Sequence, residues 1–404
     1  MDLLIRKGML TDASGEAEAD LLIRDGVIAA MGRDLQADAP VLDAEGLRVL
    51  PAFVDLHCHL RTPGQTHKET VQSASRAAVR GGYTTLNAMA NTTPVCSSAE
   101  IARAVAEEAR RGGLCDVYQC LSLTKDFDGT TLSHLRALPV DVREVVRCVS
   151  EDGRGVADGR VLRDALRLCA EKGLRVLVHA EDPAFTGVDM AFAEDLETLR
   201  DLHIAETEGL PVHFCHVSTA VSAAAIAAAK RRGTAVTWEV TPHHLALSDS
   251  TDFRVNPPLR PERDRRALIS AVLRGEAEAI STDHAPHTRE DKENGAPGLV
   301  GLETAFPVCY TVLCREEGLP LAALVRLMSE NPANLLGISK GALRIGLAGD
   351  VTLADLRVET TLDSRRFASM GRNTPFDGRK VWGKIVKTIK AGAIVYEEEA
   401  KHDN

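Results

Sequence analysis

Apolar and polar positions change their period twice along the chain. Short β-like runs, broken by turn formers such as Asp25-Gly26, fill residues 1–50. The same pattern of short runs returns from about Gly349 onward. Neither end has enough strands to bury a face by itself. We therefore expect both ends to pair into one small composite β domain, with residues 1–50 as its N-terminal part and 346–404 as its C-terminal part.

The middle of the chain, residues 51–345, alternates β-rich runs with helix-compatible stretches eight times. The β-rich runs are 53–57, 83–90, 117–123, 144–149, 175–179, 212–217, 235–240 and 279–282. Helices are expected, for example, at 68–80, 99–111, 159–172, 218–232 and 263–274. This alternation predicts an α/β fold, a (β/α)8 TIM barrel with its active site at the C-terminal strand ends. An open doubly wound sheet is the alternative, but no GxGxxG or GxxxxGK[ST] motif supports it.

Composition limits the partners and the cellular compartment that we expect for this protein. The formal charge of −10 and the pI near 5.8 argue against a nucleic-acid surface. No run approaches the roughly 18 apolar residues of a membrane helix, and the amino terminus lacks a signal-peptide core. The nine cysteines include no CxxC pair and lie mostly in apolar runs, which suits buried thiols. We interpret the protein as cytoplasmic, without nucleic-acid or membrane partners.

The stretch 51–64, PAFVDLHCHLRTPG, ends an apolar strand-like run with two histidines one residue apart. On a strand, alternate side chains share a face, so His57 and His59 point the same way. Two such imidazoles make half of a divalent-metal site, although an isolated pair also occurs at strand ends through packing alone.

Four more metal-competent residues follow other predicted strands: Asp152, His179, His216 and Asp283. Each one alone has an ordinary explanation as a core histidine or a turn aspartate. Together they would place unpaired polar groups at one end of the barrel, which is unfavourable unless something neutralises them. Four histidines and two aspartates suit two divalent ions that share one bridging carboxylate.

These motifs as a set resemble the bacterial type I dihydroorotases, cyclic amidohydrolases of the amidohydrolase superfamily, nearly from end to end. The stretches that carry the resemblance are DLHCHLRTPG (55–64), AMANTTP (88–94), SEDG (150–153), HAED (179–182), CHVST (215–219), RVNPPLR (254–260), STDHAPH (281–287) and GRNTPFDGRKVWGK (371–384). The family combines a barrel with a small composite β domain, in agreement with the pattern above.

The resemblance implies a binuclear zinc centre. Its ligands would be His57, His59 and Asp283 for one Zn²⁺, His179 and His216 for the second Zn²⁺, and Asp152 as a bridge together with a hydroxide. Asp283 would take the proton from that hydroxide and return it to the departing ring nitrogen. The implied activity is the reversible closure of N-carbamoyl-L-aspartate to L-dihydroorotate and water, EC 3.5.2.3, in pyrimidine (UMP) biosynthesis.

The resemblance also implies a set of substrate contacts: His59, Arg61, Asn91, Asn256, His287 and the backbone at Pro297 and Gly298. Arg61 offers a guanidinium fork and Asn91 an amide donor, both suited to the substrate carboxylate. Alone, Arg61 would pass for a surface arginine at a loop start. The expected partners are this small molecule, a second copy in a homodimer, and aspartate carbamoyltransferase in a possible complex.

Four departures from the family pattern keep two alternatives open. The chain has RTPG where REPG is common, Glu151 where a second aspartate is usual, a PG at 297–298 that has lost a neighbouring residue, and a short interval between His179 and His216. A noncatalytic dihydroorotase-like scaffold partner of aspartate carbamoyltransferase is one alternative, although such proteins typically lose metal ligands. A hydantoinase or allantoinase is the other, but those enzymes bridge their metals with a carboxylated lysine where this chain offers Asp152.

Overall fold

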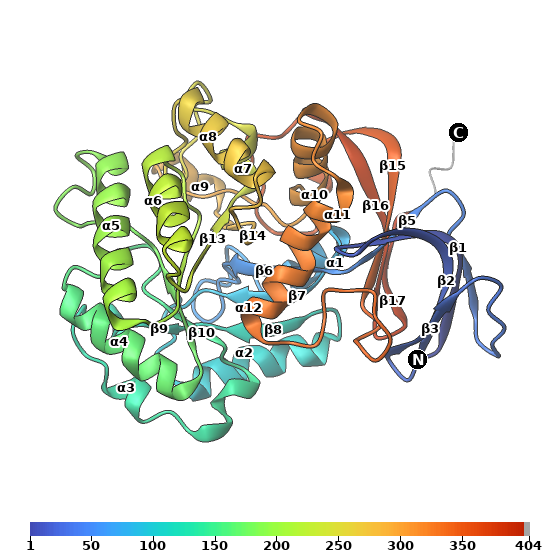
Figure 1. The fold of residues 1–404 in the computed structure, drawn as a ribbon, viewed down its shortest axis with the longest axis horizontal. Helices are drawn as coiled ribbons and strands as arrows, with labels where there is room; N and C mark the ends of the chain where they lie inside the picture. Colours follow the sequence, from blue (N-terminus) through green and yellow to red (C-terminus); the bar gives the residue numbers. More distant parts are fainter. Residues whose placement is uncertain (400–404) are drawn as a thin grey trace.

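A computed structural model describes residues 1–399 as a barrel next to a β domain, which lies at the right of Figure 1. The barrel strands are β6 (Phe53–Cys58), β7 (Tyr83–Ala88), β8 (Asp116–Gln119), β9 (Leu121–Ser122), β10 (Cys148–Ser150), β11 (Arg175–Val178), β12 (Val212–Phe214), β13 (Val236–Val240) and β14 (Ala279–Ile280). Neighbouring strands pair in parallel. β8 pairs with β7 and β9 with β10, so these two pieces act as one barrel strand.

The barrel closes between its first and last strands. Cys58 and His284 form a parallel bridge. The Asp55 carboxylate accepts a hydrogen bond from the backbone N–H of Thr282 at 2.9 Å. The predicted (β/α)8 barrel is therefore confirmed.

The fourth predicted strand began too early. The strand there is β10, at Cys148–Ser150, whereas Val140–Glu144 forms a 3-10 helix. The N–H of Val146 donates to the carbonyl of Val142 at 2.8 Å, so local turns use the backbone groups that a strand would need. Glu144, the first residue of the predicted strand, is exposed and ends this 3-10 helix.

Helices cover the outside of the barrel. They are α1 (Val71–Arg80), α2 (Ala99–Gly112), α3 (Ser133–Arg136), α4 (Gly159–Lys172), α5 (Met190–Glu208), α6 (Ala220–Arg231), α7 (Pro242–Ala246), α8 (Glu262–Leu273), α9 (Arg289–Glu293), α10 (Ala305–Cys309), α11 (Leu321–Val325) and α12 (Asn331–Leu336). Shorter segments are the 3-10 helices Lys125–Phe127 and Ser364–Arg366 and the π-helices Tyr310–Glu316 and Arg326–Glu330.

Side-chain caps explain where several of these helices begin. The side chains of Thr70, Ser98 and Asp158 accept hydrogen bonds from the first turns of α1, α2 and α4. The five predicted helices coincide with α1, α2, α4, α6 and α8 to within about three residues, the boundary uncertainty that frayed helix ends allow. Within residues 1–399, none of the helices has the length and apolar character that a bilayer crossing requires.

Both chain ends build the β domain, as predicted. Its strands are β1 (Leu3–Asp12), β2 (Gly15–Arg24), β3 (Val27–Gly32), β4 (Val41–Asp43), β5 (Arg48–Pro51), β15 (Val351–Thr361), β16 (Lys380–Lys390) and β17 (Ala393–Glu397). The sheet order is β17-β16-β15-β5-β1-β2-β3, with β4 beside β1. The antiparallel pairing of β5 with β15, with Leu50 opposite Thr352, joins the two ends. Residues 400–404 of the predicted C-terminal part lie outside the described residues.

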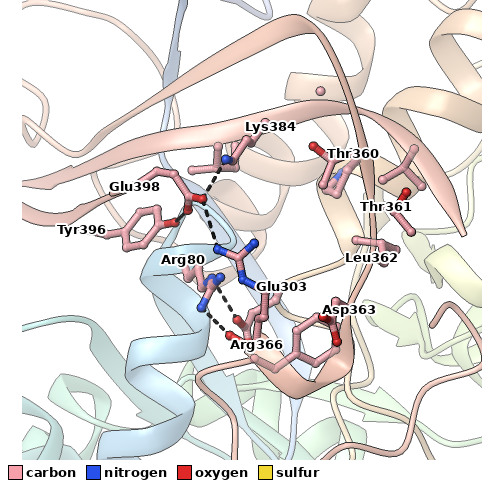
Figure 2. Close-up of a pocket in the computed structure, with 15 residues that line it drawn as sticks. Arg80, Glu303, Thr360, Thr361, Leu362, Asp363, Arg366, Lys384, Tyr396 and Glu398 are labelled. Carbon is pink, nitrogen blue, oxygen red and sulfur yellow. Dashed lines mark hydrogen bonds and ion pairs between the residues drawn. The ribbon is translucent and has the colours of Figure 1, made fainter. Parts of the chain in front are cut away.

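The β domain meets the barrel at a cleft of about 110 Å³, shown in Figure 2. Nearby, the Thr388 hydroxyl of β16 donates to the carbonyl of Val79 in α1 at 2.6 Å and so joins the two domains. Arg80 at the end of α1 reaches the buried Glu303, with Nε 3.3 Å from Oε2. Glu398, just beyond β17, accepts from Lys384 of β16 at 2.7 Å. Charged side chains on both sides of the cleft are thus paired within their own domains.

Candidate metal centre and substrate site

Six predicted ligands come together at the C-terminal ends of five barrel strands. His57 lies in β6 and His59 directly after it, and the other four follow their strands within three residues: Asp152 after β10, His179 after β11, His216 after β12 and Asp283 after β14. All six side chains are buried. The alternation of the parallel strands thus brings residues from opposite parts of the sequence to one rim.

Asp152 lies at the centre of this cluster. Its Oδ1 is 3.2 Å from His57 Nε2, 3.4 Å from His179 Nδ1 and 3.7 Å from His216 Nε2. Its Oδ2 is 3.6 Å from His59 Nε2. One carboxylate therefore touches all four imidazoles, which is the position that a bridging ligand needs.

Asp283 faces the other side of the β6 histidines. Its Oδ1 lies 3.2 Å from His59 Nε2 and 3.6 Å from His57 Nε2. Asp283 and His216 have positive φ angles, +45° and +33°, which are uncommon for residues other than glycine. Such conformations gather at functional sites, where the surrounding structure holds the side chain in place.

The cluster favours positive charge at its centre. Burial lowers the pKa of His57, but the Asp152 carboxylate outweighs burial and holds that pKa above its usual value. Burial is outweighed in the same way at His179, where Asp152 and Glu181 raise the pKa to about 10. Although burial raises the pKa of Asp152, the surrounding imidazoles bring it well below its usual range. A divalent cation would supply the charge that these groups stabilise.

The donor atoms also fit a metal. Those of His57, Asp152 and His216 lie within 4.8 Å of one another, and so do those of His57, His59 and Asp283. His57 Nε2, common to both groups, is buried and makes no hydrogen bond within residues 1–399. A buried nitrogen without a hydrogen bond is unfavourable unless a ligand occupies its lone pair. Imidazole nitrogens with carboxylate oxygens are ligands that borderline divalent ions prefer.

Arg61 is buried beside the loop that follows β14, and its φ of +56° is in the left-handed region. Its Nε donates to the carbonyl of Pro286 at 3.1 Å, and its Nη2 donates to His287 Nε2 at the same distance. The structure thus brings two predicted substrate contacts, Arg61 and His287, into direct contact with each other.

Asn91 lies between two predicted metal ligands. Its Nδ2 donates to Asp152 Oδ2 at 2.9 Å, and its Oδ1 is 2.8 Å from His59 Nδ1. The amide therefore orients His59 and the central carboxylate, in addition to any contact with substrate.

The remaining predicted contacts lie around the same rim. Asn256 Nδ2 donates to Glu181 Oε2 at 2.8 Å and lies 3.4 Å from His179 Nε2, on the side of the second expected ion. A Cβ at Gly298 would lie 3.4 Å from the His287 ring, so the 297–298 backbone is beside His287. The N–H of Gly298 already donates to the carbonyl of Arg254 at 3.0 Å.

Comparison with known proteins gives the family. Residues 48–395 match the profile of the Amidohydrolase family. The chain is 44% identical over 400 residues to a dihydroorotase from Clostridium botulinum (strain Eklund 17B / Type B), covering 98% of this chain and 100% of the relative. It is 36% identical over 427 residues to a dihydroorotase from Bacillus subtilis (strain 168), covering 98% and 99%. The chain belongs to the dihydroorotases of the amidohydrolase family. The resemblance inferred from the motifs is therefore confirmed.

Solved structures with the same fold include cyclic amidohydrolases of other specificity. The L-hydantoinase (dihydropyrimidinase) from Arthrobacter aurescens has a TM-score of 0.89 at 26% identity, covering 99% of this chain and 97% of that one. The dihydropyrimidinase from Brevibacillus agri NCHU1002 has a TM-score of 0.86 at 25% identity, covering 98% and 95%. The chain shares its fold with these hydantoinases, whereas its sequence is much closer to the dihydroorotases.

The sequence analysis did not identify two buried carboxylates that lie behind the predicted metal ligands. Glu239 of β13 lies with Oε1 3.2 Å from His57 Nδ1 and also accepts from the Ser281 hydroxyl. Glu181 Oε2 lies 2.9 Å from His179 Nε2. A carboxylate on the far nitrogen of a metal-binding imidazole fixes its tautomer and its orientation.

Signals for both residues were present in the sequence. Glu239 is a charged residue inside an otherwise apolar β run, which is unusual unless it has a buried partner. Glu181 follows His179 by two positions in the motif HAED. Neither signal identifies the histidine that each carboxylate contacts, because those pairings depend on strands that are adjacent only in the folded barrel.

Proposed function

We propose that the chain is a zinc-dependent dihydroorotase that interconverts N-carbamoyl-L-aspartate and L-dihydroorotate, with ring closure as its biosynthetic direction. The observation that carries this proposal is the position of Asp152 in contact with all four predicted histidine ligands, in a chain 44% identical to a dihydroorotase. A noncatalytic scaffold would have no need for this arrangement.

The ligand atoms divide into two sets around Asp152. His57, His59 and Asp283 would hold one zinc ion, His179 and His216 the other, and Asp152 both. Two bound zinc ions would lower the pKa of water at the site to near neutrality and stabilise negative charge on the carbonyl oxygen of the substrate.

Asp283 is the proposed general acid and base. Its Oδ1 faces His57 and His59, so we assign the transfer of protons to its other oxygen, Oδ2. The imidazoles outweigh burial and hold the pKa of the Asp283 carboxyl below its usual range, so the group is ionised and ready to accept a proton. In ring opening, Asp283 takes a proton from the water whose oxygen adds to the ring carbonyl, and it passes that proton to the ring nitrogen as the C–N bond breaks. In closure both transfers are reversed.

Arg61 and Asn91 are the proposed partners of the substrate carboxylate, and Asn256, His287 and the 297–298 backbone those of the ring. The Arg61 guanidinium is buried, so a charge-assisted hydrogen bond from it is stronger than one made at the surface. This carboxylate selectivity is what would separate the chain from the hydantoinases that share its fold.

Side-by-side assays of dihydroorotate, hydantoin and allantoin, together with zinc content, test the proposed function. We expect two zinc ions per chain and turnover of dihydroorotate far above that of the other two rings. Preferred turnover of hydantoin or allantoin would favour the hydantoinase alternative. Protein without stoichiometric zinc and without turnover would favour the scaffold alternative.

We also propose that the protein is a homodimer that associates through the outer face of α5. This helix lies at the end of the barrel that is far from the β domain (Figure 1). It buries charged residues such as Glu194 and exposes a ridge of Phe192, Leu196 and Leu199, the last at 50%. Val221 of the neighbouring α6 is also exposed. A two-fold axis would let two copies cover these exposed apolar side chains with each other.

Light scattering after size exclusion tests the dimer. We expect twice the chain mass of 43.5 kDa for the wild type and a monomer for Leu196→Glu. Val140→Glu, at an exposed apolar position elsewhere, is the control and should remain dimeric. A monomeric wild type, or a dimer that survives Leu196→Glu, would contradict this interface.

Two further proposals concern a partner protein and the cellular compartment of the enzyme. A complex with aspartate carbamoyltransferase rests on the family resemblance alone, and co-elution of the two purified proteins tests it.

A cytoplasmic, reducing compartment is supported by the cysteines. All of them are free, and all except Cys314 are buried. Fractionation of the source cells tests that location.

A further inference from the structure

Part of the motif at 371–378, GRNTPFDG, lies against the barrel loop that carries the predicted substrate contacts. Within it, the buried Asn373 donates from Nδ2 to the carbonyls of Ala285 and Gly298, both at 3.0 Å. Its Oδ1 accepts from the backbone N–H of His287 at 3.1 Å. Its own carbonyl accepts from the N–H of Val300 at 2.9 Å. One side chain thus holds both ends of the loop 285–300.

That loop in turn supports Arg61, which follows β6, the strand next to β14 where the barrel closes. The carbonyl of Pro286 accepts from Arg61 Nε, and His287 Nε2 accepts from Arg61 Nη2. A continuous set of hydrogen bonds therefore runs from Asn373, outside the barrel strands, to the guanidinium proposed to bind the substrate carboxylate.

Two features fix the segment that presents Asn373. A Cβ at Gly371 would lie 2.6 Å from Val300 Cγ1 and 2.9 Å from Pro286 Cβ, so only glycine allows this close approach to the loop. The buried Glu69 accepts from the Ser369 hydroxyl and from the N–H of Met370. The segment is thus anchored to the barrel independently of Asn373.

We propose that Asn373 is a positioning residue for substrate recognition, which holds the loop 285–300 so that Arg61 and His287 keep the orientation that the substrate needs. This inference rests on the proposed dihydroorotase function. The hydrogen bonds of Asn373 go to the loop and not to the six predicted metal ligands. Its removal should therefore weaken substrate binding and leave the metal content intact.

Steady-state kinetics of Asn373→Ala and Asn373→Asp test this role. We expect Asn373→Ala to raise KM for L-dihydroorotate by about tenfold, with kcat within about threefold of wild type and zinc unchanged, since lost uniform binding acts on KM. Asn373→Asp keeps the acceptor for His287 but turns a carboxylate oxygen toward two carbonyls, so KM should rise at least as much. Unchanged KM in both variants, or loss of zinc, would overturn the proposal.

Asn331→Ala is the matched control. Asn331 Nδ2 donates to the carbonyl of Glu278 at 2.8 Å, before β14 and so at the opposite end of the barrel from the site. Its loss should lower thermal stability without changing KM. A rise in KM equal to that of Asn373→Ala would mean that general loosening explains the effect, and would overturn the specific role.

Amide hydrogen exchange separates this inference from the proposed reaction. In Asn373→Ala we expect faster exchange in 285–300 than in wild type, and no change in the barrel strands. Unchanged protection of that loop would overturn the positioning role whatever the enzyme turns over. A wild type without dihydroorotate turnover would contradict the proposed reaction, and the exchange result would still decide whether Asn373 holds the loop.

Discussion

The six predicted metal ligands and the loop 285–300 are held in place by different means. The six predicted ligands lie in or just after parallel strands whose backbones are hydrogen-bonded to their neighbours. The loop 285–300 lies beyond the last strand and accepts two hydrogen bonds from Asn373, which belongs to a segment between β15 and β16. Strand ends fix atoms firmly, whereas a loop beyond the strands needs side-chain contacts from elsewhere to keep its shape. Damage to the first region should therefore remove metal, and damage to the second should weaken substrate binding while metal stays.

The largest effect is expected at the centre of the cluster. Asp152→Ala removes the carboxylate that touches all four histidines, so the protein should lose zinc and its hydrolysis rate should fall by about 1,000-fold or more. Elemental analysis and a hydrolysis assay measure both quantities. Asp164→Ala, at a half-exposed carboxylate on α4, is the control and should behave as wild type. Full zinc occupancy in Asp152→Ala would contradict the bridging role.

A smaller effect is expected behind the cluster, where the Glu239 carboxylate lies 3.2 Å from His57 Nδ1. In Glu239→Gln, zinc affinity measured by competition with a chelator should fall by about 10-fold to 100-fold, because the imidazole loses the carboxylate that orients it. Glu278→Gln, a partly exposed carboxylate paired with Lys230, is the control. If Glu239→Gln binds zinc as tightly as wild type, then the strand ends alone position His57.

The complementary experiment changes Arg61, which contacts the loop 285–300. Arg61→Ala removes the guanidinium that contacts Pro286 and His287, and KM for dihydroorotate should rise by about 10-fold to 100-fold, the range of one or two charge-assisted hydrogen bonds. Zinc content should not change. Arg163→Ala, at a partly exposed position on α4, controls for loss of an arginine. Loss of zinc in Arg61→Ala would contradict the separation between the predicted ligands, which hold metal, and the loop 285–300, which supports substrate binding.

The meeting of the six predicted ligands at one rim could be predicted, because it follows from local rules. Alternation in β6 puts His57 and His59 on one face, and the order of parallel strands brings Asp152 and Asp283 to the same rim. The barrel and the composite β domain followed from the same periodicities. Contacts of this kind need only the identity and the order of the strands.

The supporting contacts could not be predicted, because they join residues that no local pattern relates. Asn373 meets Ala285 across 88 positions of sequence. No helix was named for 190–208, where α5 buries Glu194 and exposes Leu199 and so reverses the usual pattern of apolar and polar faces. Such a helix has no single apolar face for a sequence pattern to detect, and its buried carboxylate is satisfied by partners such as Arg260, 3.1 Å away.

The most direct test of the central claim is zinc content and L-dihydroorotate hydrolysis measured on one preparation, before chelation, after chelation and after zinc is restored. The two-metal account predicts two zinc ions per chain at the start, loss of hydrolysis when they are removed, and recovery when zinc returns. Metal-free protein that still hydrolyses dihydroorotate at the original rate would contradict it.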